Sequence, residues 1–372
     1  MKVGTFFSGV GSPEKALENL MYAGKEHKGN PLEIEIEFAC DIDKYAKQTY
    51  LKNFKPKNFY TDITALDMKE LSYVDLLVFG FPCQAFSVAG KRLGFEDTRG
   101  TLFYDALRYL KEHRPRYFIA ENVRGLVSHD KGKTFKTIID CLGKTVNGQV
   151  PMMPLDNLGY HIHYKVLNTK DFGIPQNRNR IFIVGIRDDE DNKFKFPKEI
   201  PLELKLKDIL QDNTSSKYYL SEDRIKKIKP DFDKEWIADY RNDEGLRIRK
   251  NNISPCLAAR KHSTTDLSSM PPIIHNLQQR SANRPSIKKN KNAGGTGHLC
   301  KQDGTTYCLD SGNTQAIEIK SRIRRLTPIE CERLQGFPDN FTEGVSDTQR
   351  YKQMGNTITV NVIEKILNNL IS

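Results

Sequence analysis

Residues 2–14, KVGTFFSGVGSPE, run from an apolar stretch through a glycine-rich turn into the start of a helix. Residues 3–7 have the apolar, β-rich character of a buried strand. Ser12, Pro13 and Glu14 then supply an N-cap, a proline at the first helical position and an acid in the first turn. This order predicts the first half of a βαβ unit, and therefore an α/β fold.

Strand and helix patterns continue to alternate as far as residue 187. Further apolar, β-rich runs predict strands at 34–39, 75–79, 117–120, 161–167 and 181–186. Apolar residues at helical spacing predict helices over 101–111 and 361–371. Together they predict a Rossmann-like domain with a mostly parallel sheet covered on both faces, onto which the last helix packs back.

The chain changes character after Phe196-Pro197. Polar, Asn-rich and Gly-rich sequence follows, including NAGGTG at 292–297, with only weak strand signals. Two segments there, 254–260 and 306–312, share a short pattern around Cys-Leu, a match of a length that arises by chance. We expect a second, smaller and irregular domain.

Composition is that of an ordinary globular protein: 372 residues, 38% hydrophobic and 28% charged. The seven cysteines are scattered and never spaced C-x-x-C, so neither a disulfide framework nor a metal site is predicted. No apolar run is long enough to cross a bilayer, and no secretory apolar region precedes the first strand. We expect a cytoplasmic protein without membrane contact.

Positive charge is concentrated in one part of the chain. The formal net charge is +11, and residues 217–325 hold 22 Lys and Arg against 12 Asp and Glu, which leaves +10 in that segment. No acidic residue lies between Asp266 and Asp303. Such a concentration favours a surface that follows the phosphates of a polyanion over an ordinary solvated face.

The glycine turn predicts a nucleotide-type pocket. Gly9 and Gly11 precede a helix N-terminus, where a bare backbone can approach a ligand, and Asp41 follows the next strand, placed for ribose hydroxyls. The third glycine of a dinucleotide pattern is replaced by Glu14, whose carboxylate would face a pyrophosphate badly. A cofactor with an adenosine but no phosphate, S-adenosylmethionine, fits better. Asp62 is placed to reach an adenine amino group.

Three kinds of reactive side chain stand near the ends of predicted strands. Cys83, in GFPCQAFS at 80–87, follows one strand, and Glu121 ends another after apolar residues that would raise its pKa. Arg178 and Arg180 occupy alternate positions and so share a face if the backbone is extended. Taken singly, Cys83 would be a small hydrophobe in the core. A thiol, an acid and paired guanidiniums together favour a catalytic site.

Six motifs resemble, in order, those of the DNA (cytosine-5)-methyltransferases of bacterial restriction-modification systems. They are Phe7-Ser8-Gly9-Val10-Gly11, Gly80-Phe81-Pro82-Cys83-Gln84, Glu121-Asn122-Val123, Gln176-x-Arg178-x-Arg180, Arg325-Leu326-Thr327-Pro328-x-Glu330-Cys331 and Gly355-Asn356. The resemblance implies two lobes with duplex DNA in the cleft: a catalytic and cofactor-binding domain at 1–190 completed by 355–372, a target-recognition domain at 191–324, and a hinge segment at 325–354. It suggests no obligate protein partner, and we expect a monomer.

The resemblance also implies a chemistry for these residues. The Cys83 thiolate would add to carbon 6 of a flipped-out cytosine, because carbon 5 alone is too electron-poor to attack a methyl group. Glu121, kept protonated, would hydrogen-bond the ring. Arg180 would hold the base carbonyl, and Arg178 the neighbouring backbone or the surroundings of Cys83. Pro82 would aim the thiol.

Two sets of binding residues complete the expectation. The cofactor pocket is assigned to Phe7, Gly9, Gly11, Asp41, Ile42, Asp62, Ile63, Pro82, Leu102 and Asn356. DNA contacts are assigned to Ser87, Arg260, Arg280, Arg284, Lys288, Lys289 and Lys291. The family often has a Glu where this chain has Asp41, and an aromatic where it has Ile42, which weakens the expectation of adenine stacking there.

Two rivals on the same fold are a tRNA cytosine-5 methyltransferase and a catalytically inactive DNA-binding relative. The known tRNA enzymes carry a Cys-Phe-Thr signature after Pro-Cys-Gln that we do not find here, and inactivity is disfavoured because Cys83, Glu121 and Arg180 are all present. A nicotinamide oxidoreductase is disfavoured by Glu14. A zinc deaminase is disfavoured because PCQAF at 82–86 does not form P-C-x-x-C.

Overall fold

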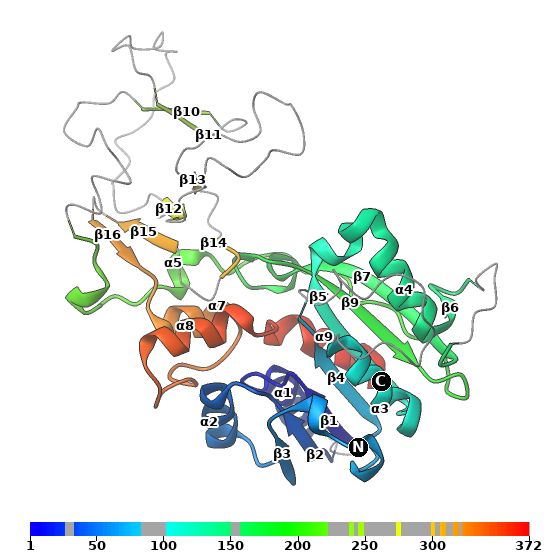
Figure 1. Cartoon of the computed structure of the whole chain (residues 1–372). Coiled ribbons are helices and arrows are strands. Elements are labelled where there is room, and N and C mark those ends of the chain that lie inside the picture. The colour runs from blue at the N-terminus through cyan, green and yellow to red at the C-terminus, as the bar shows by residue number, and fades with distance from the viewer. Residues whose placement is uncertain are drawn as a thin grey trace.

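A computed structural model describes residues 1–26, 33–82, 102–149, 157–221, 238–241, 245–248, 273–276, 299–301, 306–309, 315–319 and 322–371. Figure 1 shows the main α/β body in its lower half, with several short strands of the later chain above it. None of the helices in the described ranges is both long enough and apolar enough to cross a membrane.

The central sheet, as far as the chain is described, has eight strands in the order β3-β2-β1-β4-β5-β9-β7-β6. Their bounds are Lys2–Phe6 for β1, Glu35–Cys40 for β2, Asn58–Tyr60 for β3, Leu76–Gly80 for β4, Tyr117–Val123 for β5, Gly143–Val146 for β6, Tyr160–Asn168 for β7 and Asn179–Ile186 for β9. All neighbours pair in parallel except β9, which is antiparallel to both β5 and β7. The prediction of a mostly parallel sheet is confirmed, and all six runs predicted as strands form strands.

Alternate residues of the strands pack on opposite faces of this sheet. In β4, Leu76 and Val78 enter one hydrophobic core, whereas Leu77 and Phe79 enter the other. The first core includes residues of α1 (Ser12–Glu26) and α9 (Val360–Ile371), and the second includes residues of α3 (Leu102–His113) and α4 (Lys133–Leu142). The sheet is therefore covered on both faces, as its near-continuous apolar strands require.

The last helix returns to the first, as its pattern predicts. α1 and α9 lie side by side, and Asn19 Nδ2 donates to Glu364 Oε2 at 2.8 Å. The remaining helices are α2 (Lys44–Asn53), α5 (Leu206–Ile209), α7 (Pro328–Leu334) and α8 (Asp347–Asn356), with 3₁₀ turns η1 (Ile63–Ala65), η2 (Met68–Glu70), η4 (Arg124–Gly132), η5 (Thr169–Phe172) and η6 (Ser216–Tyr218).

The later chain forms small sheets. β12 (Ile273–Asn276), β13 (Leu299–Lys301), β15 (Gln315–Ile319) and β16 (Arg322–Arg325) make an antiparallel sheet, and β10 (Ala238–Arg241) pairs with β11 (Gly245–Ile248). One ladder joins this region to the main body: β14 (Thr306–Tyr307) pairs in parallel with β8 (Gln176–Asn177). Phe194, Leu206 and Ile209 belong to the same core as β1, so the chain just after residue 190 packs on the first domain.

A buried ion pair connects β16 of the later chain to the helix α7 that follows it. Arg324 at the end of β16 pairs with Glu330 of α7 at 2.6 Å, and both side chains are almost fully buried. Glu330 also caps its own helix by accepting from the backbone N–H of Thr327. Removing one partner of such a pair would leave a buried charge, so the start of α7 is held firmly against β16.

Candidate active site

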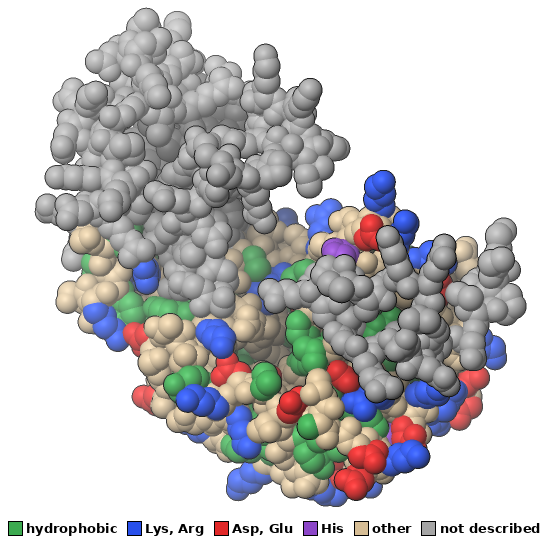
Figure 2. Space-filling view, viewed as in Figure 1, with side chains coloured by type: hydrophobic (Ala, Val, Ile, Leu, Met, Phe, Trp, Pro, Cys, Tyr) green, Lys and Arg blue, Asp and Glu red, His purple; other side chains and the backbone are tan. Residues whose placement is uncertain are grey.

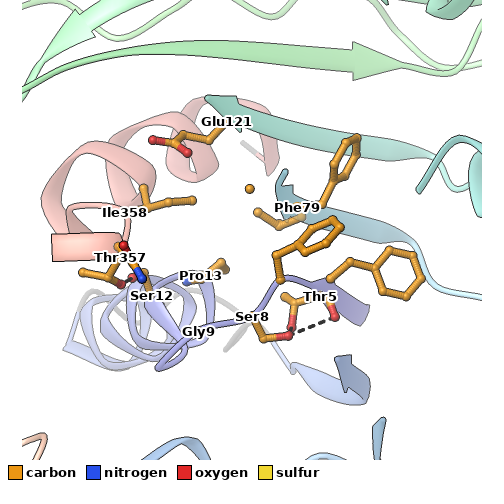
Figure 3. A pocket seen from close by; sticks show the side chains of 14 residues that line it. Thr5, Ser8, Gly9, Ser12, Pro13, Phe79, Glu121, Thr357 and Ile358 are labelled. Atoms are coloured by element: carbon orange, nitrogen blue, oxygen red, sulfur yellow. Dashed lines mark hydrogen bonds between the residues drawn. The ribbon is translucent and has the colours of Figure 1, made fainter. Parts of the chain in front are cut away.

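The carboxyl ends of β1, β4 and β5 meet at one edge of the sheet, where open α/β sheets bind their ligands. A hollow with a cavity volume of about 50 Å³, partly open to solvent, lies at this edge. Its lining residues are Thr5, Phe6, Phe7, Ser8, Gly9, Ser12, Pro13, Val78, Phe79, Gly80, Glu121, Asn356, Thr357 and Ile358. Figure 3 shows Glu121 and Ile358 on one side of the hollow and the turn with Ser8 and Gly9 on the other.

The glycine turn has the backbone conformation that its sequence suggests. Phe7, Gly9 and Gly11 have φ values of 55°, 55° and 89°, in the left-handed region that favours glycine. A Cβ atom on Gly9 would meet no atom within 4 Å, whereas one on Gly11 would lie 2.4 Å from the Phe54 ring. Gly9 thus leaves the backbone open toward a ligand, and Gly11 allows close packing on α2.

Asp41 joins the ends of β1 and β2. Its Oδ2 accepts from the N–H of Gly9 at 2.7 Å, and its Oδ1 accepts from the N–H of Asp43 at 2.8 Å. Burial raises the pKa of the Asp41 carboxyl, and these backbone donors oppose that rise. Each carboxylate oxygen keeps a further lone pair with which it can accept from a ligand hydroxyl.

Asp62 stands at the neighbouring strand end. The N–H of Asp41 donates to Tyr60 at the end of β3, and Asp62 follows as the cap of η1. Its Oδ1 accepts from the N–H of Thr64 at 2.9 Å. Burial, together with the negative charges of Asp41 and Asp62, raises the pKa of the Cys40 thiol to about 12.

The other residues assigned to the cofactor have different surroundings. Ile42 is 79% exposed, and Ile63 is buried in the core beneath α3. Leu102 begins α3 and is half-buried, and Pro82 is exposed. None of these four is among the residues that line the hollow, so their contact with a cofactor stays a prediction.

Glu14 does not face the ligand side, which corrects one step of the sequence argument. Its Oε1 accepts from Thr5 Oγ1 and from the Tyr50 hydroxyl, each at 2.7 Å, and the side chain is buried. Burial raises the pKa of this carboxyl, which the two hydrogen bonds oppose. The expected clash between Glu14 and a pyrophosphate was therefore wrong, because the carboxyl turns into the layer between α1 and α2.

The acid and one arginine come together at the same edge. The Nε of Arg180 lies 3.1 Å from Oε1 of Glu121, and the two side chains are 17% and 12% exposed. Arg180 is the second residue of β9 and lies opposite Val123, the last residue of β5. Because β9 is antiparallel to β5, its start lies beside the end of β5, and this brings the guanidinium to the carboxyl.

Burial raises the pKa of the Glu121 carboxyl, and the charges of Arg180 and Arg178 oppose the rise without cancelling it. The group is thus shifted toward the protonated state while a guanidinium remains beside it. This is the pairing of groups that can donate hydrogen bonds to an oxygen or nitrogen on which negative charge develops.

Arg178 points elsewhere. Its side chain is 2% exposed; Nη2 donates to the carbonyls of Gly355 and Thr357 at 3.1 and 2.7 Å, and Nη1 to that of Leu309 at 3.2 Å. Burial lowers the pKa of this guanidinium. Arg178 therefore fixes the two carbonyls on either side of Asn356, which itself lines the hollow.

Cys83 lies outside the described residues, as do the seven residues assigned to DNA: Ser87, Arg260, Arg280, Arg284, Lys288, Lys289 and Lys291. The chain just before Cys83 is described. Asn122 Nδ2 donates to the Phe81 carbonyl at 2.7 Å, and the Phe81 ring packs 5.1 Å from that of Phe103. The end of β5 thus anchors the backbone two residues before the thiol.

Sequence reasoning missed the contact between the two chain ends. The Ser12 hydroxyl hydrogen-bonds that of Thr357, which attaches the segment around Asn356 to the glycine turn. The sequence marks Ser12 only as a helix cap, and no local signal shows a partner 345 residues away. Among the described residues, no group of three or more His, Cys, Asp or Glu side chains is arranged to hold a metal ion.

A doubly covered α/β sheet with a glycine turn and a largely buried acid–guanidinium pair at one edge is the class of α/β protein that binds a ligand at the carboxyl ends of its strands. The whole chain, residues 1–372, matches the profile of the family described as C-5 cytosine-specific DNA methylase. The chain therefore belongs to this family, and it is a DNA (cytosine-5)-methyltransferase.

Curated relatives are similar in sequence to this chain over nearly its full length. The type II methyltransferase M.Bsp6I of Bacillus sp. (strain RFL6) is 34% identical, over 100% of this chain and 98% of its own. M.HpaII of Haemophilus parainfluenzae, also a type II methyltransferase, is 34% identical over 96% of this chain and 86% of its own. The orphan methyltransferase M.SPRI of Bacillus phage SPR is 31% identical over 100% and 97%.

Solved structures share the fold at lower identity. A DNMT2 variant of Spodoptera frugiperda has a TM-score of 0.59 and 18% identity, covering 100% of this chain and 99% of its own. A putative DNA modification methyltransferase encoded within an Escherichia coli prophage has a TM-score of 0.57 and 20% identity, covering 100% and 98%. These likenesses confirm the fold class predicted from the sequence.

Proposed function

We propose that this chain transfers a methyl group from S-adenosylmethionine to carbon 5 of a cytosine flipped out of a specific duplex DNA sequence, through a covalent adduct of Cys83 at carbon 6. The observation that supports this most directly is the Glu121–Arg180 pair, 3.1 Å apart, whose Glu121 lines the same hollow as the glycine turn. An acid and a guanidinium there suit a base whose ring becomes negatively charged.

The residues present fit this cofactor. Gly9 leaves open space at the start of α1, Asp41 offers carboxylate lone pairs for ribose hydroxyls, and Asn356 is among the residues that line the hollow. When bound, S-adenosylmethionine supplies an electrophilic methyl group.

The chain's own residues would activate the base. The Cys83 thiolate attacks carbon 6, forming an S–C6 bond and pushing negative charge onto the ring nitrogen and carbonyl. Glu121, whose carboxyl pKa is raised by burial, donates to the ring nitrogen in its protonated form. Arg180 donates to the base carbonyl, and carbon 5 becomes the nucleophile. Once carbon 5 carries the methyl group, solvent water accepts the carbon 5 proton; the C5–H electron pair forms the C5–C6 double bond, and the S–C6 bond breaks to release Cys83 as a thiolate.

The later chain would supply the DNA contacts. A net charge of +10 between residues 217 and 325 suits a surface that follows phosphates and helps offset the unstacking of the target base, about a few kcal/mol. Because curated relatives are named type II methyltransferases, we infer a role in a restriction-modification system. We also infer that the chain works as a monomer in the cytoplasm.

The test is direct. The protein is incubated with tritium-labelled S-adenosylmethionine and either duplex DNA or bulk tRNA, and methylated DNA is sequenced after bisulfite treatment. We expect label in DNA, at cytosines within one short sequence. Label in tRNA alone would overturn the proposal in favour of the RNA enzyme on the same fold.

A further inference from the structure

The later chain reaches the candidate active site at a short segment, residues 306–309. Its strand β14 pairs with β8, and the N–H of Thr306 donates to the carbonyl of Pro175 at 2.8 Å. The N–H of Leu309 donates to Gln176 Oε1 at 3.0 Å, while the other end of that amide donates to the carbonyl of Leu334 at 2.7 Å. The segment is therefore fixed against the start of β9.

This docking places Cys308 between the two motif arginines. Arg178 Nη1 donates to Cys308 Sγ at 3.1 Å, and Arg180 Nη2 lies 3.7 Å from the same sulfur. The thiol in turn donates to the carbonyl of Leu309 at 3.3 Å. Sulfur is a weak acceptor, but its donors here are charged guanidiniums, which form the stronger class of hydrogen bond.

Arg180 is thereby held from two sides. Its Nε faces Glu121 at 3.1 Å, its Nη1 donates to the carbonyl of Asn179 at 2.9 Å, and its Nη2 faces Cys308. A planar guanidinium with contacts on all three nitrogens has a fixed plane as well as a fixed position. Glu121 belongs to the sheet, whereas Cys308 belongs to the region expected to recognise DNA.

We propose that Cys308 is a positioning residue for methyl transfer, whose sulfur holds the plane of the Arg180 guanidinium so that its remaining N–H groups meet the carbonyl of the target cytosine. The inference rests on the proposed function, because it uses the role of Arg180 given there. It also gives the Cys-Leu pattern at 306–312 a physical meaning: the Leu309 backbone engages Gln176 and Arg178, and the cysteine engages both arginines. The contact that docks the recognition region on β8 therefore also orients the Arg180 guanidinium.

The test compares full-length Cys308→Ala and Cys308→Ser with a matched control, Cys141→Ala, whose half-buried thiol lies on α4 outside the site. Single-turnover methylation, DNA affinity and thermal unfolding are measured for each. We expect Cys308→Ala to slow methyl transfer about tenfold or more through misorientation of Arg180. DNA affinity and the unfolding temperature should match those of the control, and Cys308→Ser should recover most of the rate, because a hydroxyl also accepts from a guanidinium.

A double-mutant cycle separates positioning from packing. In an Arg180→Lys background, Cys308→Ala should cause no further loss of rate, because the cysteine acts through the arginine. Three results would each overturn the positioning role. The first is a rate loss in the double variant equal to the sum of the single losses, and the second is a Cys308→Ala variant with the wild-type rate. The third is an equal rate loss in Cys308→Ala and Cys308→Ser together with lowered unfolding temperatures. If the wild type methylates DNA and Cys308→Ala methylates it at the same rate, only this inference is overturned. If the wild type labels no DNA, the proposed function is overturned and this inference with it.

Discussion

At the scale of single residues, the candidate site depends on a balance at Glu121. Burial raises the pKa of its carboxyl, and Arg180 at 3.1 Å opposes the rise. Its neighbour Asn122 anchors the backbone before Cys83 through the Phe81 carbonyl. The sequence predicted the acid and Arg180 at strand ends. The resemblance left open whether Arg178 holds the neighbouring backbone or the surroundings of Cys83. It did not predict which backbone carbonyls Arg178 contacts, because a motif of alternate residues does not encode partners far along the chain.

Glu121→Gln tests the acid. The amide keeps the shape but cannot present the protonated carboxyl to the ring nitrogen, so we expect the single-turnover rate to fall roughly 10²–10³-fold with little change in DNA affinity. Glu190→Gln is the control, because Glu190 forms an ion pair with Arg116 and neither residue lines the hollow. Its single-turnover rate should equal that of the wild type. A Glu121→Gln enzyme of nearly normal rate would contradict the role assigned to this carboxyl.

The pH profile gives a second test at the same residue. Because the protonated Glu121 is the active form and its pKa is raised, activity should persist above the usual range of a glutamic acid and then fall as pH rises through that raised pKa. In Glu121→Gln the descending limb should vanish from the single-turnover rate, and a limb that remains unchanged would assign it to another group.

At the scale of elements, the strands and the long helices were predictable because their apolar patterns are local. The direction of β9 was not: its run of apolar residues reads the same for a parallel or an antiparallel strand. Only the pairing with β5 and β7 shows that its first residues, rather than its last, lie at the ligand edge. The attachment of Thr357 to Ser12 was equally hidden, since it joins the two ends of the chain.

The glycine turn makes a prediction at this scale. Gly11→Ala would set a Cβ against the Phe54 ring at a φ of 89°, so we expect a loss of about 2 kcal/mol or more in the free energy of unfolding. Gly9→Ala has no such clash and should cost roughly 1 kcal/mol from backbone strain alone, but raise the KM for the cofactor. Denaturant unfolding and cofactor titration measure the two effects. Equal destabilisation by both variants would contradict this division of roles.

At the scale of the whole molecule, most of the excess positive charge is concentrated in one part of the sequence. Figure 2 shows Lys and Arg side chains spread over the described face, around a hollow bordered by hydrophobic and acidic side chains. The excess of +10 belongs to residues 217–325, most of which lie outside the described residues. Composition alone could therefore predict a polyanionic partner, whereas the residues that read its sequence depend on loop conformations that no periodic pattern encodes.

Salt dependence of DNA binding follows from this charge. If the six basic residues assigned to DNA each neutralise a phosphate, affinity should fall roughly 10³-fold between 50 and 200 mM salt. Fluorescence anisotropy with a labelled duplex measures the slope of log affinity against log salt concentration. Replacing Lys288 and Lys289 with Gln should reduce that slope by about two, and a flat response in the wild type would rule out a phosphate-following surface.

The central claim is that Cys83 attacks the target cytosine. The most direct measurement is denaturing electrophoresis of the enzyme after incubation with S-adenosylmethionine and a duplex carrying 5-fluorocytosine at the target, because fluorine cannot leave as the proton does. We predict a covalent protein–DNA adduct for the wild type and for a Cys141→Ser control, and none for Cys83→Ser. A Cys83→Ser protein that still forms the adduct, or a wild type that forms none while methylating ordinary DNA, would contradict the account.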